Sequence, residues 1–313
     1  MAFSDKPQVF GASIKALTFG PEGKSTTIGG SNVYPLYSFD APLANPVRVG
    51  IEISDKGYDA SIPGLAAFYE GCETIVDQAK RAASAEGVDF VCLYLESADP
   101  NGDDASPEDC AALAKAVAEA IDKPLAIIGS KNAEKDSSLF VKVADELRGQ
   151  NALFLSCKEE NYKTAGAGVV LAGGQNLGGE SAVDINLAKQ LNVLLSQMGV
   201  PTDKIVMNLG NAAAGYGFEY LASTIERVKD AALGQNDAML QMPVVTIVGD
   251  DAWGVKESLL EEADAPEWGV REERGIQMEI VTASAVIGHG TDAVILRHPE
   301  SIKTISELVS DLM

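Results

Sequence analysis

The sequence predicts an α/β protein, a (β/α)8 TIM barrel with an N-terminal β-hairpin. From residue 47 onward, short apolar runs alternate with amphipathic helical stretches about eight times, and polar residues cluster where each run ends. The 313 residues contain no evident linker or low-complexity segment. Repeated strand and helix units close most economically into a barrel, in which functional groups lie at the carboxyl ends of the strands. We therefore expect the functional site at that end.

The first 46 residues differ in pattern from the rest. Apolar runs at 9–14 and 25–28, joined through a turn at Gly20-Pro21-Glu22-Gly23, predict the hairpin. We expect it to plug the amino-terminal mouth of the barrel. Residues 1–46 are thus predicted to be an extension that packs on a barrel of residues 47–313, together forming one structural domain.

The first four strands are predicted at residues 47–53, 90–95, 125–128 and 152–155. The helix after the second strand has a clear start, because Ser106 offers an N-cap hydroxyl, Pro107 suits the first helical position, and Glu108 and Asp109 complement the helix dipole. The helix after the third strand is expected to end at Gly149.

The fifth strand is ambiguous. Residues 169–171 and 180–183 compete for it, and the pairs Gly173-Gly174 and Gly178-Gly179 between them indicate either a mobile loop or a close backbone approach. The remaining strands are predicted at residues 205–207, 244–248 and 293–296, with a long acidic insertion after the seventh.

Composition limits the possible partners and location. The formal charge is -22, so a nucleic acid would be repelled over most of the surface. No apolar run reaches the roughly 18 residues that a membrane span needs. The first residues lack a basic segment followed by an apolar one, which argues against an export signal. We expect a cytoplasmic protein.

The four cysteines show no spacing typical of metal or cluster sites, because no C-x2-C pair occurs. Cys72, Cys92 and Cys110 fall in apolar or helical patterns that favour buried thiols. Cys157 is expected near the rim of the fourth strand, where an inert thiol is the preferred interpretation over a reactive one.

The predicted rim carries seven polar groups: Glu96-Ser97, Ser130-Lys131-Asn132, Ser156-Cys157-Lys158, Asn208, Asn211, Asp250-Asp251 with Trp253, and Arg297-His298. A metal-dependent hydrolase would need convergent histidines, whereas the chain has two, His289 and His298. We place His289 on the opposite face, and we expect His298 to cap the last helix rather than act in catalysis.

Two other rim features have alternative explanations. A desolvated Lys131 or Lys158 would suit a Schiff-base lyase, but a solvated lysine is the default at such positions. Trp253 either anchors a partner as an exposed aromatic side chain or packs in a local core.

Four stretches carry a resemblance to a known family: Val183-Asp184-Ile185-Asn186-Leu187-Ala188-Lys189-Gln190-Leu191-Asn192, Gly215-Tyr216-Gly217-Phe218-Glu219-Tyr220, Met239-Leu240-Gln241-Met242-Pro243 and Asp251-Ala252-Trp253-Gly254-Val255-Lys256-Glu257. In this order they resemble the small subunit of the corrinoid/iron-sulfur protein, which is the delta subunit of the acetyl-CoA decarbonylase/synthase system. The resemblance runs from the hairpin to the C-terminus.

This resemblance implies a (β/α)8 subunit in a heterodimer of the reductive acetyl-CoA pathway. The large subunit of such a heterodimer carries a 4Fe-4S cluster and a corrinoid domain. Its cobalt accepts a methyl group from methyltetrahydrofolate, delivered by a separate methyltransferase, and passes it to acetyl-CoA synthase. The hard chemistry then belongs to a cofactor held mainly by the partner, and we expect no catalytic residue and no metal site in this chain.

The expected role is that of a movable lid over the corrinoid (cobalamin) at the interface with the large subunit. Rim geometry selects Asn208, Asn211, Asp250, Asp251 and Trp253 as candidate contacts to the corrinoid. The main alternative is a barrel methyltransferase that binds methyltetrahydrofolate itself, for which Glu96, Asn132 and Asn208 are available.

Overall fold

The computed structural model describes residues 6–37 and 40–312, and it confirms the barrel. Eight parallel strands form it: β3 (Arg48–Ser54), β4 (Phe90–Tyr94), β5 (Leu125–Ile128), β6 (Leu153–Cys157), β7 (Asn176–Glu180), β8 (Ile205–Asn208), β9 (Val245–Ile247) and β10 (Ala293–Leu296). The sheet order is β8-β7-β6-β5-β4-β3-β10-β9. A parallel bridge between Met207 and Val244 joins β8 to β9 and closes the ring.

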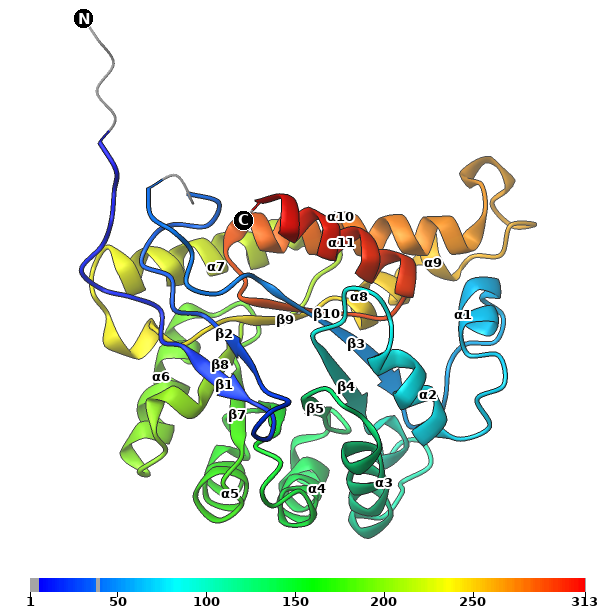
Figure 1. Cartoon of the computed structure of the whole chain (residues 1–313), viewed down its shortest axis with the longest axis horizontal. Helices are drawn as coiled ribbons and strands as arrows, with labels where there is room; N and C mark the ends of the chain where they lie inside the picture. Colours follow the sequence, from blue (N-terminus) through cyan, green and yellow to red (C-terminus); the bar gives the residue numbers. More distant parts are fainter. Residues whose placement is uncertain (1–5, 38–39, 313) are drawn as a thin grey trace, which may run out of the picture.

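Helices surround the strands (Figure 1). They are α1 (Pro63–Phe68), α2 (Ile75–Ala83), α3 (Pro107–Ala120), α4 (Ala133–Glu146), α5 (Tyr162–Ala165), α6 (Ile185–Gln197), α7 (Phe218–Leu233), α8 (Gly249–Gly254), α9 (Lys256–Leu259), α10 (Arg271–His289) and α11 (Pro299–Leu312). Short 3-10 turns are η1 (Glu96–Ala98), η3 (Thr202–Lys204), η4 (Ala238–Leu240) and η5 (Pro266–Trp268), and η2 (Gly166–Ala172) is a π-helix. The predicted cap of α3 is confirmed, since the Ser106 side chain accepts from the Asp109 N–H.

The N-terminal hairpin pairs β1 (Leu17–Phe19) with β2 (Thr26–Ile28). The predicted second strand and turn are confirmed, but the predicted first strand at residues 9–14 is wrong. The short turn pairs Phe19 with Thr26, so the residues directly beside the turn form the ladder. The residues before β1 instead run beside the segment that follows β2, where Ile14 N–H donates to the Ser31 carbonyl at 2.8 Å.

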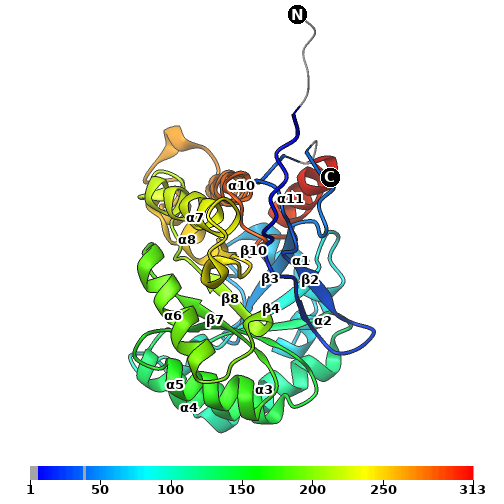
Figure 2. The same ribbon diagram turned by 90° about the vertical axis from the view of Figure 1, so that its left-hand side faces the viewer.

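The hairpin plugs one end of the barrel, as predicted. Leu17, Phe19 and Ile28 are fully buried and join the cluster of side chains that fills the barrel interior. The Phe19 ring packs edge-on against Phe90, at the first position of β4, with centroids 5.2 Å apart. Figure 2 shows the hairpin on the side opposite to the projecting loop that precedes α10. The division of the chain at residue 46 stays a prediction.

Two glycines are required where the barrel interior is tightest. A Cβ on Gly50 would lie 2.4 Å from the Phe90 ring, which itself packs against Phe19 of the hairpin, so no room is left for a side chain there. A Cβ on Gly178 would lie 2.9 Å from Leu155 and 3.2 Å from Val206. The fifth strand is β7, so both candidate positions are wrong: residues 169–171 lie in the π-helix η2, and residues 180–183 overlap β7 at Glu180 alone. Gly178 permits a close backbone approach within β7 rather than a mobile loop.

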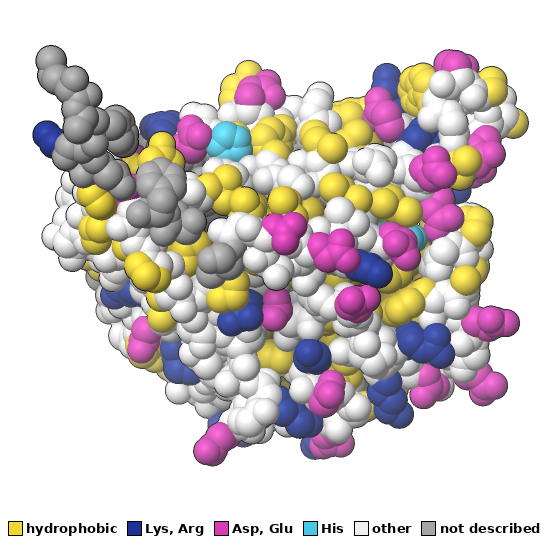
Figure 3. Space-filling view, turned by 45° about the horizontal axis from the view of Figure 1, so that its top comes forward, with side chains coloured by type: hydrophobic (Ala, Val, Ile, Leu, Met, Phe, Trp, Pro, Cys, Tyr) yellow, Lys and Arg dark blue, Asp and Glu magenta, His cyan; other side chains and the backbone are white. Residues whose placement is uncertain are grey.

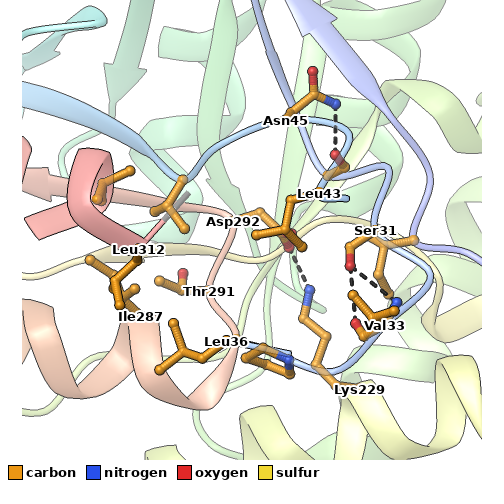
Figure 4. Close-up of a pocket in the computed structure, with 16 residues that line it drawn as sticks. Ser31, Val33, Leu36, Leu43, Asn45, Lys229, Ile287, Thr291, Asp292 and Leu312 are labelled. Atoms are coloured by element: carbon orange, nitrogen blue, oxygen red, sulfur yellow. Dashed lines mark hydrogen bonds and ion pairs between the residues drawn. The ribbon is translucent and has the colours of Figure 1, made fainter. Parts of the chain in front are cut away.

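A small apolar hollow lies at the amino-terminal face, between the segment after the hairpin and helices α10 and α11 (Figure 4). Val33, Leu36 and Ile287 contribute to its wall. At its base, the Lys229 ammonium and the Asp292 carboxylate form a buried ion pair at 2.6 Å. Asp292 also accepts from the Val244 N–H at 2.7 Å, so this pair fixes the start of β9.

The surface mixes both charge signs. On the face that carries α10 and α11, Lys and Arg side chains lie scattered among Asp and Glu rather than gathered into one basic patch (Figure 3). Within the described residues, no helix has the length and apolar character needed to cross a bilayer.

Candidate functional site

A polar cavity of about 360 Å³ opens at the carboxyl ends of the strands. The ends of β5 to β9 and the first turn of α8 contribute to it, which is the end of a barrel that carries functional groups. Its polar lining consists of Lys131, Asp136, Ser156, Lys158, Glu180, Asn208, Asn211, Asp250 and Asp251. Four of the five predicted contact residues therefore lie together at this mouth.

The two asparagines are held by hydrogen bonds to their surroundings. Asn208 is 2 % exposed, and its Nδ2 donates to the Ser156 hydroxyl at 3.2 Å while its Oδ1 accepts from the Gly210 N–H at 3.1 Å. The Asn211 amide contacts the main chain of Gly210 and Ile247. Both side chains are thus fixed in orientation, Asn208 at the end of β8 and Asn211 in the loop that follows, which favours recognition of a ligand by shape.

A chain of charges crosses the mouth. Lys131 pairs with Asp250, whose other carboxylate oxygen lies 3.5 Å from Arg297 Nη2. Arg297 also donates from Nε and Nη2 to one oxygen of Glu52, at 3.1 and 2.5 Å. Burial alone would raise the pKa of Asp250, but Lys131 and Arg297 outweigh it and lower that pKa. Asp250 is therefore a fixed anion within this chain of charges.

Asp251 behaves differently from its neighbour. Burial and the adjacent Asp250 charge raise the pKa of Asp251 to about 6. No hydrogen bond from a described residue engages its side chain. A carboxyl group in this state both accepts hydrogen bonds and, when protonated, donates one, which suits it to contact a ligand at the mouth.

Lys131 is charged rather than primed for Schiff-base chemistry. Burial opposes its charge, but the Asp250 carboxylate and the Tyr94 hydroxyl raise its pKa above the ordinary value. Its ammonium also lies 4.7 Å from the Tyr94 ring centroid. A Schiff-base lysine needs a lowered pKa. Lys158 pairs with Glu180 at 3.4 Å. This geometry disfavours the lyase interpretation.

The prediction that Trp253 is an exposed aromatic is wrong, and the local core alternative is confirmed. Its side chain is 7 % exposed and stacks on the His298 ring with centroids 5.7 Å apart. A Cβ on Gly275 would lie 2.3 Å from the indole, so α10 closes over the ring. Trp253 is therefore on the buried side of α8, the helix that also carries Asp250 and Asp251.

Both histidines are engaged within the chain. His298 is 1 % exposed, its Nδ1 accepts from the Glu300 N–H at 3.2 Å, and its Nε2 lies 3.1 Å from Glu272. The predicted cap of the last helix is confirmed. His289, at the end of α10, lies 2.7 Å from Glu226.

Cys157 is the last residue of β6 and is fully buried, so it lies in the barrel wall. Burial raises the pKa of its thiol to about 12. A thiol in this state is not a nucleophile near neutral pH. The preferred interpretation of an inert cysteine is confirmed.

Backbone strain is concentrated at the cavity. Three lining residues other than glycine have positive φ: Lys131 (66°), Ala182 (45°) and Val183 (58°). A β-branched residue in this conformation is a true outlier, held here because Val183 N–H donates to the Leu209 carbonyl at 2.7 Å. Such strain persists where the surroundings enforce it and is common at functional sites.

Sequence reasoning missed three acids near the mouth. Glu52 sits inside an apolar strand, and this charge among Val49, Ile51 and Ile53 was the available signal. Glu180 escaped attention because its strand was not located. Asp136 lies in the first turn of α4 and accepts from Ser130 N–H and Oγ, both at 2.7 Å, which no sequence spacing indicates.

The comparisons with known proteins decide the family. A model of the CO dehydrogenase/acetyl-CoA synthase delta subunit matches residues 16–309. This chain belongs to that family. Among its relatives is the acetyl-CoA decarbonylase/synthase complex subunit delta 1 of Methanosarcina thermophila, 32% identical over 94% of this chain and 67% of the relative. The subunit delta of Methanocaldococcus jannaschii is 30% identical over 92% of this chain and 70% of its own.

Solved structures agree on the fold. The 7,8-dihydropteroate synthase of Vibrio fischeri superimposes with a TM-score of 0.56 at 12% identity, covering 95% of this chain and 98% of that one. The Yersinia pestis dihydropteroate synthase with a pterine-sulfa conjugate superimposes with a TM-score of 0.55 at 11% identity, covering 94% of this chain and 98% of that one. At such identity the likeness supports the barrel alone.

Proposed function

We propose that this delta-family chain is the small subunit of a heterodimeric corrinoid/iron-sulfur methyl carrier in the reductive acetyl-CoA pathway. In this proposal the carboxyl-terminal mouth of the barrel caps the corrinoid held by the large subunit. The family match over residues 16–309 carries the assignment. The 4Fe-4S cluster belongs to the large subunit, and a methyltetrahydrofolate methyltransferase and acetyl-CoA synthase are transient partners.

The shape of the mouth supports a cap rather than a container. A corrin with its peripheral arms is far larger than the cavity of about 360 Å³. The macrocycle therefore lies across the mouth, where amide, carboxyl and main-chain groups meet its polar periphery. Asn208, Asn211, Asp250 and Asp251 line the cavity and would hold it. The buried Trp253 side chain anchors α8 to α10 and His298.

The chemistry of these groups fits a role without bond making. A bound corrinoid supplies the cobalt that accepts and donates the methyl group. Asp250 is fixed by Lys131 and Arg297, and Asn208 is fixed by Ser156 and Gly210, so these side chains orient the disc and exclude water. Both imidazoles have partners within the chain. Access for two protein partners in turn requires that the cap move.

The test is copurification. We expect the tagged full chain, coexpressed with the corrinoid-bearing large subunit, to retain that subunit and its visible corrin absorption. Asp251→Ala at the mouth should weaken the complex, whereas Asp145→Ala on the exposed side of α4 should not. Binding of methyltetrahydrofolate by the chain alone, without retention of a corrinoid partner, would support the barrel methyltransferase instead.

A further inference from the structure

A second cavity, of about 170 Å³, lies beside the mouth, between the end of β3 and helices α1 and α2. The Glu52 and Arg297 ion pair contributes to its wall next to the mouth. Exposed Asp59 and half-buried Glu96 lie at its edge. Neither the capping function nor the family comparison assigns this cavity a role.

Three buried side chains that line this cavity have a polar group without a partner among the described residues. Glu52 is 3 % exposed, and its Oε2 has no hydrogen-bond partner. Gln78 is 8 % exposed and Tyr69 is 3 % exposed, and neither the Gln78 amide nor the Tyr69 hydroxyl bonds to any described group. Buried polar groups are almost always paired, so three together indicate a ligand or ordered water.

The acids of the cavity are paired with cations, which favours a neutral ligand: at the edge, Asp59 pairs with Arg271 at 3.4 Å and Glu96 with Lys56 at 3.9 Å. Arg297 directs both Nε and Nη2 at Glu52 Oε1 and so already neutralises this carboxylate. The free Oε2 needs a hydrogen-bond donor rather than a second cation. Burial, with the nearby Cys72 and Glu52, raises the pKa of Tyr69, so its hydroxyl stays protonated and donates. The ligand must therefore offer a donor and an acceptor together.

The walls set the size and shape. Tyr58 and Tyr69 stack at 5.0 Å between ring centroids, and Leu65 and Ile53 add apolar surface. With about 30 Å³ for each water in the liquid, the cavity holds a group of about five or six heavy atoms. A short aliphatic arm that ends in a planar amide matches both the apolar walls and the polar end.

We propose that this cavity binds a primary carboxamide, with its N–H donating to Glu52 Oε2 and its carbonyl accepting from both the Tyr69 hydroxyl and the Gln78 amide. The identity of this carboxamide rests on the proposed function: it is one of the peripheral arms of the corrin that covers the mouth. An arm held in this cavity restrains the rotation of the disc relative to the barrel, because the cavity has room for one arm at a time.

The first experiment measures binding of free propionamide to the full chain by saturation-transfer NMR. Tyr69→Phe and Gln78→Met remove one polar group each and keep the side-chain volume. We expect propionamide to bind, propionate to bind more weakly, and each variant to lower propionamide affinity by about fivefold to tenfold. Tyr162→Phe and Gln150→Met, outside the cavity, are the matched controls and should have no effect.

Thermal unfolding separates binding from folding. Because each variant removes an unpaired buried polar group, its midpoint should equal or exceed that of the parent chain. Lost affinity with unchanged or raised stability supports a binding site. Failure of propionamide to bind, or an affinity in both Tyr69→Phe and Gln78→Met equal to that of the parent chain, would overturn the proposal and leave ordered water as the occupant.

The second experiment identifies the source of the amide. Cobinamide, with carboxamide arms, and cobyrinic acid, with carboxylate arms, are titrated into the chain together with the large subunit. If cobinamide binds more tightly than cobyrinic acid and both variants lose this preference, a corrin arm is the source of the carboxamide. Variants that lose propionamide but keep cobinamide would overturn that source. A chain that binds propionamide but retains no corrinoid-bearing subunit would overturn the proposed function alone.

Discussion

Asp250 and Asp251 are adjacent in α8, yet the pKa values of their carboxyl groups are shifted in opposite directions. Lys131 and Arg297 lower the pKa of Asp250 despite its burial. Burial and Asp250 raise the pKa of Asp251 to about 6. One residue is thus a fixed anion and the other a carboxyl group that changes charge near neutral pH.

The first prediction concerns pH and stability. An unfolded aspartate titrates near 3.9, so as the pH rises through about 6 the stability that protonated Asp251 contributes is lost. Asp251→Asn should remove this loss and be relatively more stable at neutral pH, by about 1 kcal/mol after allowance for solvent screening. Urea unfolding between about pH 4 and about pH 7 measures it.

Asp250→Asn is the matched control with the opposite sign. The lowered pKa of Asp250 contributes stability at neutral pH that is lost as the pH falls, so this variant should be relatively less stable at neutral pH. If the free energies of unfolding of the two variants changed with pH in the same way, the opposite pKa shifts of Asp250 and Asp251 would be refuted.

The second prediction concerns the buried ion pair. Arg297→Met leaves Glu52, with a side chain 1% exposed, without its counter-ion and should lower the free energy of unfolding by about 3 kcal/mol. The double variant Glu52→Gln with Arg297→Met should recover most of that loss. A double-mutant cycle by urea unfolding measures the coupling, and additive losses would show that the pair is not coupled.

The third prediction concerns the support of α8. Gly275→Ala places a Cβ 2.3 Å from the Trp253 indole and should cost about 1 to 3 kcal/mol of stability. Gly254→Ala, where no atom lies within 4 Å, should be neutral or slightly stabilising. Equal unfolding midpoints in the two variants would mean that the contact between α8 and α10 is not tight.

The fourth prediction concerns thiol reactivity. Cys72 is half-buried, whereas Cys92, Cys110 and Cys157 are buried. A thiol-specific reagent such as Ellman's reagent should modify one cysteine in the native chain and all four after denaturation. Rapid native modification of Cys157, identified by peptide mass, would contradict its burial in the barrel wall.

The barrel was predictable because its strands carry local signals. The third and eighth strands were predicted with the bounds that β5 and β10 show, since each is a buried apolar run between turn residues. β7 escaped because Gly178 and Gly179 replace apolar side chains where neighbouring strands crowd. A hydrophobic pattern cannot reveal a strand that is selected for small volume.

The site was only partly predictable for a related reason. Strand ends place Asn208 and Asp250 at the mouth, so their position follows from the chain order alone. Glu52 depends on Arg297, which lies 245 residues away, and Trp253 depends on packing against Gly275 and His298. Such contacts arise from closure of the barrel, and no local spacing encodes them.

The most direct test of the capping account is methyl transfer by the isolated chain from methyltetrahydrofolate to free cob(I)alamin, followed by the corrin absorption spectrum. The account predicts that the rate with the chain equals the rate in a control without it, because the barrel shelters a partner's corrinoid and supplies no reactive group. Transfer that requires the chain and is abolished by Asn208→Ala would contradict it.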